Sequence, residues 1–76
     1  MNKEEVSKII NAANDLFGDA SNTFRRRFGW LINIRESAEC SHEDAEKIFR
    51  TALSMKLLKS EHICSHDYHY YVVDSI

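Results

Sequence analysis

Apolar residues recur every three or four positions in two stretches of the chain, which is the period of an amphipathic helix. In the first stretch Asn2 is placed to cap a helix and Gly18 to end it, so a helix is predicted from about Lys3 to Phe17. The apolar positions of this helix are Val6, Ile9, Ile10, Ala13, Leu16 and Phe17. The second stretch begins at Ser41, a capping hydroxyl followed by carboxylates, and predicts another helix. Its apolar positions are Ala45, Ile48, Phe49, Ala52 and Leu53.

The segment between these helices, residues 23–36, has a mixed pattern. Phe24, Phe28, Leu31, Ile32 and Arg35 have helical spacing, and Ser21 or Asn22 would cap the helix. Against this, a glycine at position 29 costs about 1 kcal/mol relative to alanine inside a helix, and residues 30–34 alone also fit a strand. The spacing of the phenylalanines favours a helix, followed by a turn over residues 37–40 that leaves room for a short extra strand.

After Leu58 the pattern changes from helix to strand. Residues 60–64 and 68–73 are separated by a polar break at Ser65-His66-Asp67, and the second run is rich in aromatic and β-branched residues. This is typical of a β-hairpin. Three helices followed by a two-stranded hairpin predict one α+β domain over residues 1–76, mostly α, of the winged-helix class. The hairpin should pack against the helices, because its apolar face would otherwise stay open.

Several segments together resemble the second half of a DEP domain. They are Trp30-Leu31-Ile32, residues 41–46, Ala52-Leu53 with Leu57-Leu58, and Tyr68-His69-Tyr70-Tyr71, so the resemblance covers roughly residues 28–73. It implies a winged-helix variant used for protein and membrane docking in signalling. The chain departs from the DEP pattern in having no room for the hairpin arm that usually follows the first helix. The resemblance therefore supports the winged-helix fold and little else.

Composition narrows the classes of protein. Apolar residues at 43% and charged residues at 29% are ordinary for a folded domain. With no proline and two glycines, a glycine-rich phosphate loop is not expected. No apolar run approaches the ~18 residues needed to span a bilayer, and the acidic start lacks the apolar core of a secretory signal. Together with only two cysteines, this predicts a cytoplasmic protein with reduced thiols.

The charge of the chain argues against DNA as the ligand. Ten basic residues face twelve acidic ones, for a net charge of −2, whereas DNA-binding domains are usually basic. The start of the predicted third helix, where helix-turn-helix proteins read bases, is His42-Glu43-Asp44. Carboxylates there complement the helix dipole but repel phosphate. We therefore expect the chain to bind a protein rather than DNA.

Two features supply candidate contacts. Residues 25–27, three consecutive arginines, suit an acidic partner, or alternatively form a solvated helix face whose stems cover neighbouring phenylalanines. Both faces of the last strand are largely apolar, which predicts either a fully packed hairpin or an exposed aromatic interface. The predicted partner-binding residues are Arg25, Arg26, Arg27, Trp30, Tyr68, Tyr70 and Val72.

The tripeptide Cys-Ser-His occurs twice, at residues 40–42 and 64–66. Two cysteines and two histidines can form a tetrahedral zinc site if the hairpin returns beside the start of the third helix. The C-x-H spacing is unusual for structural zinc, and unrelated thiols are the simpler interpretation, so no cofactor is expected. The zinc hypothesis names Cys40, His42, Cys64 and His66. In the hairpin His62, His66 and His69 are expected to fill exposed strand and turn positions rather than to form a pH-sensitive element.

No serine, cysteine or histidine is arranged with a base and an orienting acid, so the chain is not expected to be an enzyme. The leading hypothesis is a non-catalytic winged-helix module that docks on a protein partner, as an adaptor or a small inhibitor of a macromolecular complex. The alternative is a winged-helix transcriptional regulator that binds DNA as a homodimer, with its third helix in the major groove. The DNA contacts would then be Arg25, Arg26, Arg27, Lys47, Arg50, Thr51 and Ser54.

Overall fold

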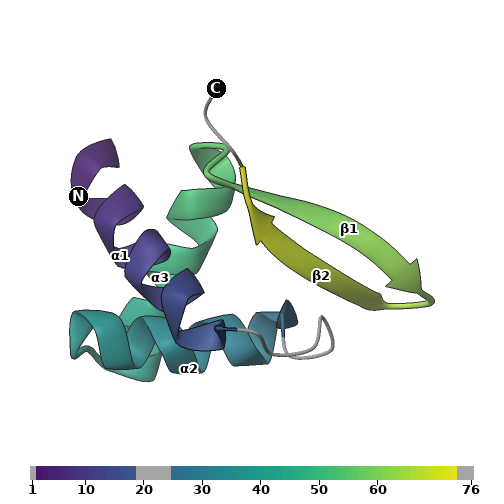
Figure 1. The fold of residues 1–76 in the computed structure, drawn as a ribbon, viewed down its shortest axis with the longest axis horizontal. Coiled ribbons are helices and arrows are strands. Elements are labelled where there is room, and N and C mark those ends of the chain that lie inside the picture. The colour runs from purple at the N-terminus through teal and green to yellow at the C-terminus, as the bar shows by residue number, and fades with distance from the viewer. Residues whose placement is uncertain (1, 19–24, 74–76) are drawn as a thin grey trace.

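The computed structural model describes residues 2–18 and 25–73, which form three helices followed by a β-hairpin (Figure 1). The helices are α1 (Lys3–Phe17), α2 (Arg27–Ala38) and α3 (His42–Ser54), and the strands are β1 (Leu58–Cys64) and β2 (Asp67–Val72). The predicted α+β, winged-helix-like arrangement is therefore confirmed. No helix in the described part of the chain is long and apolar enough to cross a bilayer.

Helices α1 and α3 begin as their sequences predict. The Asn2 side chain accepts a hydrogen bond from the backbone N–H of Glu5 at 2.8 Å. Ser41 Oγ accepts from the N–H of Asp44 at 3.2 Å. At the end of α1, Gly18 has a φ of +53°, a conformation that side chains rarely adopt, and it donates to the carbonyl of Asp15 at 3.0 Å.

Helix α2 differs from the prediction at both ends. It begins at Arg27, and its cap residue, Arg26, forms no side-chain hydrogen bond with the helix. The cap residues and helix start predicted over 21–24 lie outside the described residues. The strand alternative for residues 30–34 is wrong, since these residues are helical. The short strand expected before α3 is also wrong, because α2 continues to Ala38 and turns at Glu39, whose φ is +50°.

The core lies between the three helices and the base of the hairpin. Its largest fully buried side chains are Trp30 and Phe49, from α2 and α3. The other buried apolar residues are Val6, Ile10, Ala13, Phe17, Leu31, Ile34, Ala45, Ile48, Ala52 and Leu58. Leu58 is the first residue of β1, so the hairpin contributes to the core where it leaves the helices, as expected from its apolar pattern.

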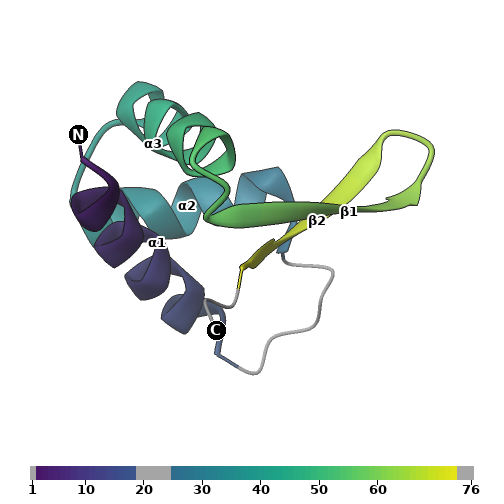
Figure 2. The same ribbon diagram turned by 90° about the horizontal axis from the view of Figure 1, so that it is seen from above.

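Beyond this base the hairpin projects to one side of the helices in both views (Figures 1 and 2). The strands are antiparallel, with Leu58 opposite Val72 and Glu61 opposite His69, and the register shifts between His62 and Cys64. Every residue of β1 after Leu58 is exposed. The hairpin is thus an arm with its base in the core and an exposed β1, whereas Asp67 at the start of β2 is half-buried.

Candidate functional site

The three consecutive arginines contact three different parts of the chain. Arg25 donates to Asn14 Oδ1 in α1 at 2.6 Å, and its guanidinium lies 4.8 Å from the centroid of the Phe17 ring. Arg26 Nη2 lies 3.6 Å from the carboxylate of Asp67 in β2. These contacts tie the start of α2 to α1 and to the far end of the hairpin, since Asp67 is the first residue of β2.

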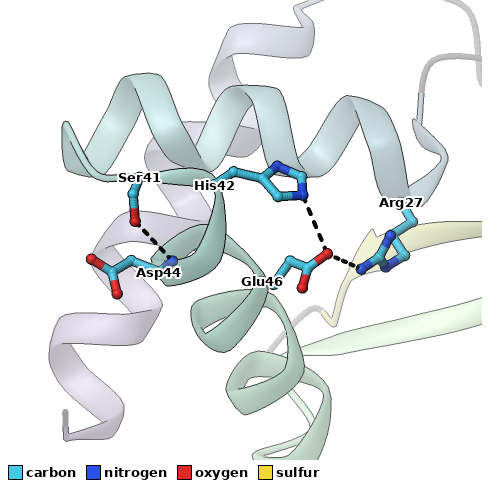
Figure 3. Close-up of polar contacts among 5 residues, drawn as sticks. All are labelled: Arg27, Ser41, His42, Asp44 and Glu46. Carbon is cyan, nitrogen blue, oxygen red and sulfur yellow. Dashed lines mark hydrogen bonds and ion pairs between the residues drawn. The ribbon is translucent and has the colours of Figure 1, made fainter.

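Arg27, the third of the arginines, contacts α3. Its Nη2 donates to Glu46 Oε1 at 2.6 Å, and His42 Nε2 lies 3.3 Å from the same oxygen (Figure 3). The solvated-face alternative therefore holds only in part, because each arginine also has a partner within the chain. The side chains of Arg26 and Arg27 remain 49% and 53% exposed, so part of each guanidinium still faces solvent.

The contact with Arg27 changes the acidity of Glu46. The hydrogen bond from Arg27 is the main cause of a lowered Glu46 pKa, aided by the charges of Arg27, His42 and Arg50 and opposed by partial burial. Of the α3 carboxylates near the helix start, Glu46 is therefore held ionised and neutralised by its neighbours. Glu43 and Asp44 are exposed, so the tip of the helix keeps its acidic surface.

Replacing Arg27 with glutamine is expected to raise the Glu46 pKa toward the ordinary carboxyl value, because the hydrogen bond and the charge are both lost. In the wild type the folded-state pKa lies below the unfolded one, so this stabilisation is present above the ordinary carboxyl pKa and disappears as the pH falls through the folded value. NMR titration of the Glu46 carboxyl carbon measures the shift. Lys47→Gln, which removes an exposed charge from the same helix, is the control; a Glu46 pKa unchanged by R27Q would contradict the assignment.

The α3 residues named for DNA contact differ in exposure. Lys47, Arg50 and Ser54 are exposed and spaced three or four residues apart, which places them on one outer face. Thr51 is half-buried instead. It lines an open groove of about 590 Å³ together with Ile9, Ala38, Cys40, Asp44, Lys47 and Ile48.

Among the residues predicted to contact a partner, Trp30 is buried, and Tyr70 and Val72 are half-buried. Trp30 is completely buried, and its indole N–H donates to the backbone carbonyl of Tyr70 at 2.9 Å. The expectation that Trp30 belongs to an exposed patch is therefore wrong. Tyr70 and Val72 are half-buried and pack against the core, where the Tyr70 ring meets Phe49 edge to face at 4.9 Å. Trp30 therefore has no surface to offer a partner, whereas Tyr70 and Val72 remain partly exposed.

The exposed apolar residues of the hairpin lie toward its far end. Tyr68 is 42% exposed, as predicted for a contact residue, and its ring lies 5.0 Å from that of His62. Ile63 is 46% exposed beside the register shift in β1. Sequence reasoning missed Ile63 because a single isoleucine among polar residues carries no periodic signal.

Two further exposed apolar residues belong to α2. Phe28 is 71% exposed and Ile32 is 41% exposed, one helical turn apart. The sequence places them with Leu31 in the stripe of the predicted helix. The structure buries Leu31, but it buries Trp30 and Ile34 in place of Phe28 and Ile32. The signal was present, since an apolar residue at almost every position of 28–34 means that some must face solvent.

The histidines of the hairpin differ in their exposure to solvent. His62 and His66 are exposed, as expected, and His62 Nε2 lies 3.0 Å from the Ser65 carbonyl oxygen. His69 is only 7% exposed, so its expected surface position is wrong. Its Nε2 has no hydrogen-bond partner among the described residues, and its ring lies 6.5 Å from that of Tyr71.

The four residues of the zinc hypothesis do not come together. Cys40 lies in the turn between α2 and α3, whereas Cys64 lies near the tip of the hairpin; both views show these places at opposite ends of the molecule (Figures 1 and 2). The described residues contain no cluster of three or more His, Cys, Asp or Glu that could hold a metal ion. The hypothesis fails because the hairpin projects outward instead of folding back along α3.

No protein-family model, curated protein or solved structure matches the chain. Functional inference therefore rests on the contacts, exposure and charges of its own residues.

Proposed function

We propose that the chain is a non-catalytic docking module that binds a protein partner through its hairpin, as an adaptor or a small inhibitor of a larger complex. The observation that carries the proposal is the exposure of Tyr68 and Ile63, at 42% and 46%, on an arm that projects from the helices. An arm of this kind reaches a surface groove that the helices themselves would be too broad to enter.

The far end of the hairpin has the composition of an interface core. Tyrosine is enriched among the residues that dominate protein–protein binding energy, and it loses little side-chain freedom on binding. The Tyr68 ring is already placed against His62, which reduces the entropy cost further. Polar neighbours such as Glu61 and Ser65 are exposed and suit the rim of such a contact.

Contact through side chains is favoured over strand addition. Within the described residues β1 pairs only with β2, so its other edge has free N–H and C=O groups that a partner strand could use. The register shift between His62 and Cys64 interrupts that edge, however, and such bulges are a common device against edge-to-edge pairing. Ile63 and Tyr68 are therefore the residues on which binding should depend.

The charge distribution also favours a protein over DNA. The arginines at 25–27 have partners in the chain, and Glu43 and Asp44 are exposed at the start of α3. A phosphate backbone would have to compete with the carboxylates that already contact Arg26 and Arg27, and it would be repelled by Glu43 and Asp44. A protein surface lacks the uniform negative charge of a phosphate backbone, so it need not be repelled by these carboxylates.

A second candidate function, DNA binding, is supported by the exposed face of α3. Lys47, Arg50 and Ser54 share that face, and α3 is followed by the hairpin in the order of winged-helix DNA-binding domains. We rank it second because Glu43 lies on the same face, four residues before Lys47.

Replacing Ile63 and Tyr68 together by serine is expected to reduce binding of the native partner by at least about tenfold, because hot-spot residues of this kind usually contribute a factor of that size. The measurement is affinity purification from the native cell, with proteins and nucleic acid both identified, followed by titration of the captured protein. Leu16→Ser, which removes an equally exposed apolar side chain from α1, is the matched control.

Two results would overturn the docking proposal. One is undiminished partner binding by the folded double variant. The other is retention on duplex DNA at low salt, falling steeply with added salt and lost when Lys47 and Arg50 are replaced by alanine; that result would establish the second candidate.

A further inference from the structure

We infer that the outer face of α2, formed by Phe28, Ile32, Arg35 and Glu39, is a contact between two copies of this chain. In this dimer the two α2 helices run antiparallel about a two-fold axis that passes near Ile32. The Phe28 ring of each copy fills a hollow at the far end of the α2 helix of the other copy. This surface is separate from the hairpin, so the inference goes beyond the docking function.

The apolar part of this face has no cover within the described residues. Phe28 is 71% exposed and Ile32 41%, at positions i and i+4 of α2. They lie on the side of the helix opposite Trp30 and Ile34, which are fully buried. A phenylalanine exposed to this extent beside a second apolar residue is typical of a surface that another molecule covers.

A hollow on the same face is placed to receive Phe28. It has a volume of about 380 Å³ and is lined by Ile32, Arg35, Glu36, Glu39 and Cys40. At a rise of about 1.5 Å per residue, Phe28 lies ~6 Å before Ile32 along the helix axis, and the middle of the hollow, near Glu36, lies ~6 Å after it. A two-fold axis at Ile32 therefore brings each Phe28 opposite the hollow of the other copy, and the contact is self-complementary.

The charges of α2 fit the same arrangement. Its start carries the arginines at 25–27, and its end carries two carboxylates, Glu36 and Glu39, beside one basic residue, Arg35. This order is opposite to the one that the helix dipole favours. Among the described residues neither Glu36 nor Glu39 forms an ion pair. In an antiparallel pair the basic start of each helix lies beside the acidic end of the other, where half-exposed guanidiniums such as that of Arg26 have free N–H donors.

A single helix face buries less than the ~800 Å² per partner of a standard interface, so a reversible dimer with a dissociation constant of roughly micromolar order is expected. Sedimentation velocity of the full chain from about 1 µM to about 1 mM measures it. Phe28→Ala should weaken the dimer on the order of 100-fold or more, because a two-fold axis removes two rings with one substitution. Leu16→Ala, at the 52% exposed position in α1, should leave it unchanged.

Cross-linking tests the position of the axis, because a residue on a two-fold axis meets its own copy. In a background of Cys40→Ala and Cys64→Ser, Ile32→Cys should form a disulfide-linked dimer under mild oxidation, whereas Leu16→Cys should not. A wild-type chain that stays monomeric at ~1 mM would overturn the inference, as would equal dimerisation of the folded F28A and L16A variants or equal cross-linking at positions 16 and 32. Loss of partner binding by the hairpin variant with the dimer intact would separate the two proposals.

Discussion

Replacing Trp30 with alanine is expected to lower the free energy of unfolding by about 3–5 kcal/mol, the usual cost of truncating a large buried aromatic side chain. Trp30 is completely buried. Its ring meets Phe17 of α1 edge to face at 4.9 Å, and its N–H donates to the carbonyl of Tyr70 in β2 at 2.9 Å. The substitution therefore loosens α1 and the hairpin from α2 at the same time.

The loss is large relative to the whole stability. At about 0.05–0.15 kcal/mol per residue, a chain of 76 residues has roughly 4–11 kcal/mol in total. Trp30→Phe should cost less, about 1–3 kcal/mol, since it keeps an aromatic ring but leaves the Tyr70 carbonyl without its donor. Urea unfolding followed by far-UV circular dichroism measures both, because Trp30 is the only tryptophan and fluorescence is lost with it.

Leu16→Ala is the control for this experiment, because an exposed side chain should change the stability by no more than about 0.5 kcal/mol. Similar unfolding midpoints for W30A and L16A would mean that Trp30 is not the centre of the core.

The parts of the fold whose sequence signals all indicate the same element were predictable from the sequence. Helix α1 has one apolar stripe, a capping asparagine and a terminal glycine, and its predicted bounds match the structure. Helix α3 begins at the predicted cap, Ser41. The hairpin was identified by its change of residue type. In each case the intrinsic propensity of the residues and the period of their apolar positions indicate the same element. Such agreement makes the element predictable from the sequence.

Helix α2 was less predictable because its sequence contains two competing apolar stripes. One includes Phe28 and Ile32, and the other includes Trp30 and Ile34. Only packing decides between them, since α2 lies between α1 and α3 and buries the side with the largest ring. The same competition explains why Trp30 was expected at the surface and why Phe28 was not.

Only part of the candidate site was predictable, because the sequence does not show how far each residue of the hairpin lies from the helices. The last strand shows apolar residues on both faces, but its sequence does not say how far each lies from the helices. Tyr68 and Tyr70 differ in this respect alone: the first is 42% exposed, and the second packs on Phe49. The partners of the arginines were equally hidden, since Glu46 is 19 positions from Arg27.

The two proposed surfaces would reinforce one another. A dimer joined along α2 carries two hairpins, each with an exposed Tyr68 and Ile63. If a partner offers two suitable sites, binding through both hairpins can raise the overall affinity by 10² to 10⁴, provided that the spacing allows both to engage. A weak dimer contact would then matter most when the partner is itself an oligomer.

The last strand offers a direct test of which tyrosine supports the fold. Tyr70→Ser is expected to lower the free energy of unfolding by about 2–3 kcal/mol, because it removes a partly buried aromatic ring from the core. That ring meets Phe49 at 4.9 Å. Tyr68→Ser, two residues earlier on the same face of β2, should cost no more than about 1 kcal/mol, since its ring is 42% exposed and lies against His62 of the neighbouring strand rather than in the core.

Urea unfolding of both variants, followed by the fluorescence of Trp30, measures the difference, because the buried indole reports on the junction between the helices and the hairpin. A loss of stability that is equal at the two positions would mean that the hairpin packs on the helices along its whole length, and an arm with an exposed end would then be the wrong description. A large loss at Tyr70 alone, with partner binding lost at Tyr68 alone, would separate the residue that holds the arm from the residue that uses it.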